Sequence, residues 1–346
     1  MKISKPRSFD LSFGTAYAQA KEIALTQPHV PLETPGSVQL EQRGGQPFYY
    51  WYRYNLDGKR ITTYLGSAND PSVLQQIEII REGNEGVELL KRYSSDLRKI
   101  GFYSVDRPTG ITLSVLFNHG ILTRGAVLVG THAFGVILND LNASCLVQMT
   151  EDVDLGRRRN IELGGNLEQG FLGLLQSSGL RFLEVPQLKR HEPSTSFKVL
   201  GSKLKVDLLV PARREPYASV AIPELKTYAT ALPHFDFLLE KTNLSVALGR
   251  DRIVPVTVPD AGRFCVHKMV VYSLRTNDNA KRQKDIYQAA MLALILGSEQ
   301  ESLLREAIDD LPNAMRTIAK SGARKVITLL EEMGEEQSAQ VLEAIG

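Results

Sequence analysis

Three aspartates occur where carboxylates can do chemistry. Asp152 and Asp154 form an Asp-x-Asp pattern on the predicted strand 147–155, and side chains two apart on a strand share a face. Adjacent carboxylates repel each other and are costly to desolvate without a counter-charge. Mg²⁺ prefers oxygen ligands and often bridges substrate phosphates, so this pair favours a magnesium site. Asp207 lies among apolar residues on the predicted strand 204–210, where a carboxylate is unfavourable unless it has a partner.

A glycine–threonine pair precedes these acids at a predicted strand-to-helix junction. The apolar strand 126–129 runs into Gly130 and Thr131, and a helix is predicted over 132–140. A residue without a Cβ lets a phosphate approach the backbone, and the free N–H groups at a helix start favour an anion. Gly-Thr and Asp-x-Asp patterns are each common in turns and caps. The Gly-Thr pair, the Asp-x-Asp pair and the isolated Asp207, in this order along the chain, together favour a functional site.

Helices and strands alternate around these residues. Apolar periodicity over 109–297 predicts a mixed α/β region. Before it, aromatic and β-branched residues flank an Asp-Gly turn, which predicts a hairpin over 46–66. A long amphipathic helix is predicted over 71–101, while prolines and Gly36 indicate a loop over 28–45.

The predicted class is α+β, with a mixed sheet and flanking helices. Three regions are expected: an N-terminal region over 1–104 with the aromatic hairpin and long helix, a catalytic domain over 105–297, and a helical tail over 298–346. The apolar faces of the tail would pack on the core, or dock a partner or a second copy of the chain.

Composition excludes several classes of protein. The 346 residues are 43% hydrophobic and 23% charged, which is ordinary for a globular chain. The longest apolar run, 289–296, is too short to cross a bilayer, and no secretory signal follows Met1, so no membrane partner is expected. Two cysteines, Cys145 and Cys265, are too few for a disulfide framework, which favours a cytoplasmic setting. A net charge of +2 demands no nucleic-acid partner, so any such contact would depend on a local patch.

Together these residues resemble the nucleotidyltransferase fold of the polymerase-β type, and more specifically a bacterial nucleotidyltransferase-fold family within that superfamily. The resemblance spans about residues 45–297. It rests on the segments that hold the glycine–threonine pair and the three aspartates, with support from the hairpin and three later segments: 128–134, 150–155, 205–209, 50–66, 232–239, 259–268 and 281–288. More distantly, Lys268 and Lys284-Asp285 resemble a late lysine and aspartate in abortive-infection nucleotidyltransferase toxins.

The resemblance implies transfer of a nucleoside monophosphate from a nucleoside triphosphate to an acceptor, with pyrophosphate as the leaving group. It implies two Mg²⁺ ions, or Mn²⁺ in their place, held by Asp152, Asp154 and Asp207, with Asp207 also taking the acceptor proton. The acceptor would be an RNA, such as a tRNA end, or a protein. The distant likeness to toxins implies a toxin or phage-defence setting, with an antitoxin as partner.

The resemblance also implies a nucleotide-binding set beside the metals. Gly130 and Thr131 would hold phosphate oxygens, and Lys268 would neutralise the triphosphate. Lys268 has the alternative of a solvated helix position. Asp285 has the alternative of a pair with Lys281 or Lys284 on its own predicted helix.

Other polar residues have ordinary structural explanations. His132 and His267 lie in mixed apolar runs, which favours buried or hydrogen-bonded histidines over catalytic ones. No cysteine–histidine spacing supports zinc. Arg157-Arg158-Arg159 follows the metal strand and would either grip phosphates or form a solvated loop.

The aromatic hairpin gives a second functional hypothesis. The tyrosines of 50–54 share one predicted face, and Trp51 and Arg53 the other. One face is expected to pack on the long helix. The opposite face, near Arg53, Lys59 and Arg60, would be structural or would contact nucleic acid. The alternative function is therefore a non-catalytic nucleic-acid-binding protein on a nucleotidyltransferase-like scaffold.

Overall fold

A mixed sheet lies at the centre of the chain. The computed structural model describes residues 4–148, 150–157, 160–162, 167–187, 191–276 and 278–345. Within them, seven strands take the order β11-β12-β10-β7-β5, with β9 pairing β10 and β8 pairing β9. Their bounds are β5 (Ala126–Val129), β7 (Asp152–Arg157), β8 (Phe182–Glu184), β9 (Ser196–Val199), β10 (Lys205–Pro211), β11 (Ser219–Ile222) and β12 (Thr227–Leu232). Because β7 and β10 are parallel and β5 is antiparallel to β7, the amino ends of β7 and β10 meet the carboxyl end of β5.

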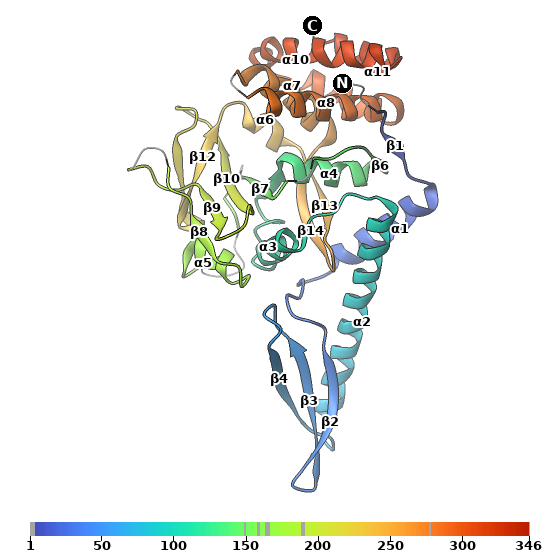
Figure 1. Ribbon diagram of the computed structural model, residues 1–346, viewed down its shortest axis with the longest axis vertical. Helices are drawn as coiled ribbons and strands as arrows, with labels where there is room; N and C mark the ends of the chain where they lie inside the picture. Colours follow the sequence, from blue (N-terminus) through green and yellow to red (C-terminus); the bar gives the residue numbers. More distant parts are fainter. Residues whose placement is uncertain are drawn as a thin grey trace.

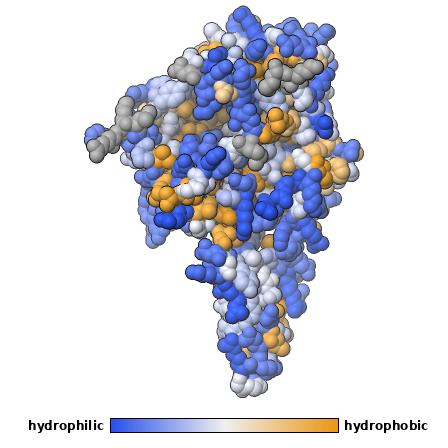
Figure 2. Space-filling view, in the orientation of Figure 1, coloured by the Kyte–Doolittle hydropathy of each residue, from blue (hydrophilic) through white to orange (hydrophobic). Residues whose placement is uncertain are grey.

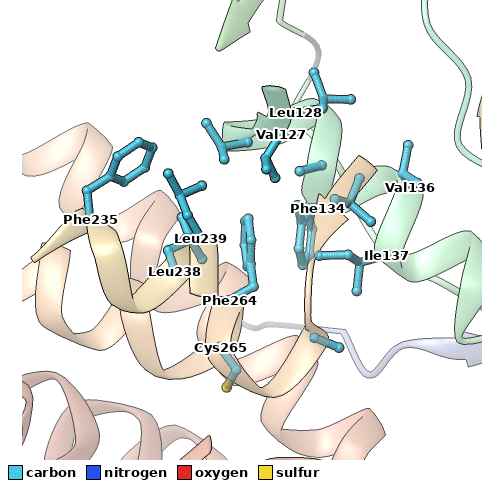
Figure 3. Packing of buried hydrophobic residues seen from close by; sticks show 14 of the residues in the cluster. Val127, Leu128, Phe134, Val136, Ile137, Phe235, Leu238, Leu239, Phe264 and Cys265 are labelled. Atoms are coloured by element: carbon cyan, nitrogen blue, oxygen red, sulfur yellow. The ribbon is translucent and has the colours of Figure 1, made fainter. Parts of the chain in front are cut away.

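Helices and a second hairpin pack around this sheet (Figure 1). They are α3 (Arg107–Asn118), α4 (Gly130–Asp140), α5 (Gly170–Gln176), a 3-10 turn (Pro223–Leu225), α6 (Phe235–Glu240), β13 (Thr242–Leu248), β14 (Ile253–Pro259), α7 (Ala261–Leu274) and α8 (Asn279–Glu299). Phe134 of α4 stacks on Phe264 of α7, with ring centroids 6.2 Å apart. Figure 3 shows these two rings beside the buried residues of β5 and α6. This packing fixes α7 relative to α4.

The C-terminal helices belong to the same core. They are α9 (Glu301–Asp309), α10 (Asn313–Glu332) and α11 (Glu336–Glu343). One cluster of buried residues runs from the sheet as far as Ile345. Gly322 of α10 packs so closely on the backbone of Met269 that a Cβ there would collide with it. The tail therefore supports α7 from the side opposite α4. None of the described helices combines the length and apolarity that crossing a membrane requires.

The N-terminal residues form an elongated extension, which we call the stalk (Figure 1). After β1 (Arg7–Ser8), which pairs with β6 (Ala143–Ser144), and α1 (Leu11–Leu25), the stalk consists of β2 (Ser37–Arg43), β3 (Gln46–Tyr54), β4 (Arg60–Ser67) and α2 (Pro71–Ile100). The Asp70 side chain accepts from the Ser72 N–H and caps α2, and Pro71 fits its first turn. Gly101 ends α2 with a left-handed φ of 112°, where a glycine is favoured.

Most predicted elements are confirmed, and the α+β class with them. The hairpin, the long helix and the strand 126–129 occur as expected. The predicted loop over 28–45 is wrong in its second half, because Ser37–Arg43 adds β2 as a third strand to the hairpin. The strand predicted from 147 begins only at Asp152. The strands β11 and β12 were not expected, because a short strand that depends on distant pairing has little local signal.

Candidate active site

Strand register brings the three aspartates together at one edge of the sheet. Asp207 lies directly opposite Asp154 across the parallel pair β10 and β7. Asp152 lies opposite Lys205 in the same ladder. On the other side of β7, Val129 pairs with Asp154, so the next residue, Gly130, begins α4 beside the carboxylate. Carboxylates from two strands thus share the edge at which a helix starts.

Gly130 touches this carboxylate in a way that another residue could not. Its φ is +69°, in the left-handed region that favours glycine. A Cβ at position 130 would collide with Oδ2 of Asp154. No side chain caps the start of α4, because the preceding residue is Val129. The backbone N–H groups of that first turn are therefore available to an anion beside Asp154.

Burial and charge crowding destabilise the ionised form of Asp154. Burial raises its pKa to about 7, and the neighbouring charges of Asp207 and Asp152 act in the same direction. Lys205 and Lys268 lower it by a smaller amount. A carboxylate in this condition gains most from an added cation, because the cation offsets both causes.

Lys205 supplies part of that positive charge. Its Nζ lies 2.7 Å from Oδ2 of Asp207, and the two side chains are 32% and 18% exposed. Partial burial lowers the pKa of Lys205, but the hydrogen bond to Asp207 and the charges of the three aspartates outweigh it, so the net shift is upward. The other oxygen, Oδ1 of Asp207, is buried and has no hydrogen-bond partner among the described residues.

The carboxylate edge fits a divalent cation in donor chemistry. No group of three or more His, Cys, Asp or Glu side chains in the described ranges already surrounds a point where a metal ion could sit. However, Oδ1 of Asp207 is a buried acceptor without a donor, and Asp154 is a carboxylate that needs positive charge. Both observations fit a hard cation with oxygen ligands.

A cationic wall faces this edge from α7 and α8. Lys268 Nζ lies 2.9 Å from Oδ1 of Asp285, and Arg275 Nη1 lies 3.0 Å from Oδ2 of the same carboxylate. Asp285 is only 2% exposed, so it holds two cations from below the surface. The alternative that Asp285 pairs with Lys281 or Lys284 on its own helix differs from the ion pairs of the described residues, which join Asp285 to Lys268 of α7 and to Arg275 just after α7.

Lys284 adds a further cation, and its surroundings disfavour its charged form. Burial and the nearby charge of Lys268 lower its pKa despite the surrounding carboxylates. Lys284 and Lys281 line the same cavity as the aspartates. An ammonium whose charge is disfavoured by a second ammonium is stabilised when a polyanion enters between them.

The two charged sets line a single cavity of about 400 Å³. All six residues predicted for the site line it: Gly130, Thr131, Asp152, Asp154, Asp207 and Lys268. Apolar residues from β10, β12, the turn after β12, α6 and α7 also line it: Leu209, Leu232, Pro233, Phe235, Leu238 and Val271. The cavity is within the range of volumes that hold small ligands, and it has acidic, cationic and apolar sides.

Other residues considered from the sequence lie outside this chemistry or at its rim. His132 is buried, with Nδ1 2.7 Å from the Tyr103 hydroxyl, and burial lowers its pKa to about 4. His267 lines the cavity, but burial lowers its pKa to about 3 and keeps it neutral. Arg157 pairs with Glu224, at 2.6 Å. Arg158 and Arg159 lie outside the described residues.

Sequence reasoning missed two residues of this site, Lys205 and Arg275. An alternating strand places residues 205 and 207 on one face, so the sequence carried a signal for Lys205. Lys284 enters the sequence analysis only through its likeness to the toxins. The place of Arg275 and Lys284 in the cavity depends on how α7 and α8 pack, and no local pattern indicates that packing.

Comparisons with known proteins give a family for the central part of the chain. A family model described as "Nucleotidyltransferase" matches residues 107–312. A solved structure, the crystal structure of an antigenic nucleotidyltransferase-like protein from Paracoccidioides brasiliensis, aligns at 15% identity and a TM-score of 0.31, over 62% of this chain and 91% of that chain. No curated protein matches.

Proposed function

Because this chain belongs to the nucleotidyltransferase family, we propose that it moves a nucleoside monophosphate from a nucleoside triphosphate to a hydroxyl of an RNA or protein acceptor. The observation that carries the proposal is the register of β7, β10 and β5. It sets Asp154 between Asp207 and Gly130 in a cavity whose other sides are cationic and apolar.

The cationic and apolar sides of the cavity, with the start of α4, would hold the nucleoside triphosphate. The N–H groups after Gly130 and the Thr131 hydroxyl would donate to phosphate oxygens. Lys268, Arg275 and Lys284 would neutralise the triphosphate, since they face the acidic edge across the cavity. The apolar wall would contact the base and sugar.

The acidic edge would serve the acceptor and a divalent cation. Asp152, Asp154 and Asp207 would hold Mg²⁺ or Mn²⁺, which when bound would offset the charge on the attacking and leaving oxygens. Oδ1 of Asp207, which has no donor among the described residues, would accept the proton of the acceptor hydroxyl. The acceptor oxygen would then bond to the α-phosphorus, the bond to the β-phosphate would break, and pyrophosphate would leave.

Lys205 has a place in this scheme as a tethered counter-ion. Its ammonium lies 2.7 Å from Oδ2 of Asp207 and offsets the charge of that carboxylate. A cation entering the edge would compete with it, and the flexible lysine side chain can then turn toward Asp152, its neighbour across the ladder. Lys205 would thus limit the mutual repulsion of the aspartates between turnovers.

Label transfer tests the activity. The full chain would be incubated with each α-labelled nucleoside triphosphate, with Mg²⁺ or Mn²⁺, and with total cellular RNA or protein. We expect label on one acceptor class, lost in Asp154→Ala and retained in Asp236→Asn, which removes an exposed carboxylate on α6 outside the cavity lining. Absence of label with every nucleotide and metal, or label that persists in Asp154→Ala, would reject the proposal.

Thermal unfolding separates this enzyme from a non-catalytic nucleic-acid-binding protein. A ligand that binds only the folded state raises the melting temperature. We expect nucleoside triphosphate and Mg²⁺ together to raise it, and Asp152→Ala to abolish the rise. A scaffold without a nucleotide site would show no rise in either protein.

The toxin or phage-defence setting is the most specific part of the proposal, and it can be tested separately from nucleotidyl transfer. Induced expression in a bacterial host tests it by growth. The wild-type chain should arrest growth, and the Asp152→Ala chain at equal abundance should not. Equal growth of both cultures would remove the toxin setting, and with it the need for an antitoxin, while leaving nucleotidyl transfer in place.

A further inference from the structure

The three-stranded sheet of the stalk has one face that the packing of the chain leaves open. The stalk lies outside the residues matched by the family, 107–312. The open face, which we call the tyrosine face, follows from strand alternation and register. It includes Glu41, Arg43, Tyr50, Tyr52, Arg60 and Tyr64, together with their same-face neighbours on β2, β3 and β4. In Figure 2 the stalk extends from the body and is mainly hydrophilic on the side shown.

The opposite face of this sheet is covered around Trp51 and Arg53, although Leu40 of β2 on the same face is 52% exposed. Trp51 Nε1 donates to the Pro35 carbonyl at 2.9 Å. The Arg53 guanidinium lies 3.9 Å from the Trp51 ring centroid and pairs with Glu33 at 3.6 Å. Arg53 was expected near a nucleic-acid surface, but these contacts use it within the stalk. The expectation that one face contacts nucleic acid therefore concerns the tyrosine face alone.

The tyrosine face joins aromatic rings to guanidinium groups. The Tyr64 ring lies 5.4 Å from that of Tyr50 and 5.9 Å from that of Phe48. The Arg43 guanidinium lies 4.4 Å from the Tyr50 centroid, and that of Arg60 5.0 Å from the Tyr52 centroid. These contacts hold both guanidinium groups over the rings of the sheet, where cation and ring attract each other.

Much of this surface remains in water. Tyr64 is 55% exposed and Tyr54 is 48% exposed. The Arg43 side chain is 58% exposed. Tyr50, at the centre of the face, is only 9% exposed. Burial of the outer rings and of Arg43 therefore contributes little to folding, and a second role explains the exposed part of the group better than stability does.

We propose that the tyrosine face binds single-stranded RNA. Unpaired bases stack on tyrosine rings and guanidinium planes, and a duplex keeps its bases inside. Arg60 and Lys59, at the adjoining turn, supply positive charge for phosphates, and so does Arg43, whose guanidinium pairs at 2.8 Å with Glu41, the one acid of the face. Glu41 already accepts from the Tyr52 hydroxyl and from the Arg43 guanidinium, so the side-chain oxygens of the neighbouring Gln39 and Thr62 are the acceptors offered to ribose 2′-hydroxyls.

Binding of labelled oligonucleotides to the full chain tests this proposal. The probes are a mixed-sequence 20-nucleotide RNA, the same RNA as a duplex, and the same sequence as single-stranded DNA. The variant Arg43→Ala/Arg60→Ala removes both guanidiniums from the tyrosine face. The matched control, Arg81→Ala/Arg92→Ala, removes two exposed arginines from α2 in the same stalk.

We expect the single-stranded RNA to bind most tightly. Arg43→Ala/Arg60→Ala should weaken its binding at least tenfold and reduce the dependence of log K on log salt by about 1.4, because two phosphate contacts are lost. The control pair should change affinity less than twofold. Tighter binding of the duplex, equal binding of DNA, equal loss in both variants, or no RNA binding would each overturn the proposal.

This result is independent of nucleotide transfer. Asp154→Ala should bind the RNA as tightly as the wild-type chain, because the aspartate lies in the cavity and not on the stalk. Conversely, Arg43→Ala/Arg60→Ala should keep the rise in melting temperature produced by nucleoside triphosphate and Mg²⁺. A chain whose RNA binding depends on Asp154 would place the RNA in the cavity and reject the tyrosine face as its site.

Discussion

The cavity and the tyrosine face are two charged surfaces built by opposite means. In the cavity, β7 and β10 force like charges together, and the pKa of Asp154 rises to about 7 as a result of burial and its neighbours. On the tyrosine face, Arg43 and Arg60 lie over rings and remain open to water. The first arrangement stores unfavourable charge that a ligand relieves, whereas the second costs the fold little. Substitutions should therefore have large effects in the cavity and small effects on the stability of the stalk.

Asp207→Asn should give the largest effect. It keeps the size of the side chain but removes the carboxylate that would accept the acceptor proton, so we expect at least a hundredfold loss of transfer rate. Single-turnover label transfer measures it, with Asp236→Asn as the control. A loss of less than threefold would show that the transfer rate depends no more on the carboxylate of Asp207 than on a surface carboxylate.

Gly130→Ala should damage both the fold and the site. The added Cβ would meet Oδ2 of Asp154 at a left-handed backbone position. We expect a loss of about 2 kcal/mol in the free energy of unfolding, and loss of the nucleotide-dependent rise in melting temperature. Denaturant unfolding measures the first. As a control, Gly334→Ala tests the same left-handed strain in open space, and it should leave nucleotide binding intact.

Asp154→Asn should stabilise the metal-free chain at high pH. The pKa of Asp154 is about 7 in the folded state against 3.8 when exposed, so the folded chain binds the extra proton between these values. The free energy of unfolding therefore falls as pH rises from 4 to 7. We expect Asp154→Asn to be more stable than the wild type by about 2 kcal/mol at pH 8 and equally stable at pH 4. Urea unfolding at pH 4 and pH 8 measures this. An equal difference in the free energy of unfolding between Asp154→Asn and the wild type at both pH values would contradict the prediction.

Lys205→Met should tighten metal binding. Without the ammonium at 2.7 Å from Asp207, an added cation meets less competition. We expect half-maximal stabilisation by Mg²⁺ at a roughly fivefold lower concentration. Lys203→Met, on the exposed turn before β10, is the matched control and should behave as the wild type. Weaker Mg²⁺ binding in Lys205→Met would instead assign the lysine to positioning the carboxylates.

Arg43→Ala/Arg60→Ala should have the smallest effect on stability. Both guanidiniums are exposed, and exposed charges contribute little to folding. We expect the free energy of unfolding to change by less than about 0.5 kcal/mol for each substitution, within the usual range for surface positions. Urea unfolding measures it. A loss above about 2 kcal/mol would make the tyrosine face a structural element and erase the contrast with the cavity.

Local patterns predicted the parts of the site that belong to single elements. The Asp-x-Asp spacing, the glycine before a helix and the lone acid of an apolar strand each reflect one strand or one helix start. The pairing of Asp285 with Lys268 and Arg275 could not be predicted, because it depends on how two helices meet. The strand β2 was missed because its residues are mostly polar, whereas its partner β3 is rich in aromatic residues and gave the clear strand signal.

The close packing of α10 on α7 means that the region matched by the family is shorter than the region needed for stable folding. The matched family region stops at residue 312, before α10 begins. Beyond that point, Met315, Val326 and Leu342 are each no more than 3% exposed. A shortened protein that ended at 312 would expose to solvent the face of α7 that packs on α10. The helix that carries Lys268 would then lose this packing. We therefore expect it to precipitate or lose nucleotide binding, so a minimal enzyme should be cut on the N-terminal side and keep its last helix.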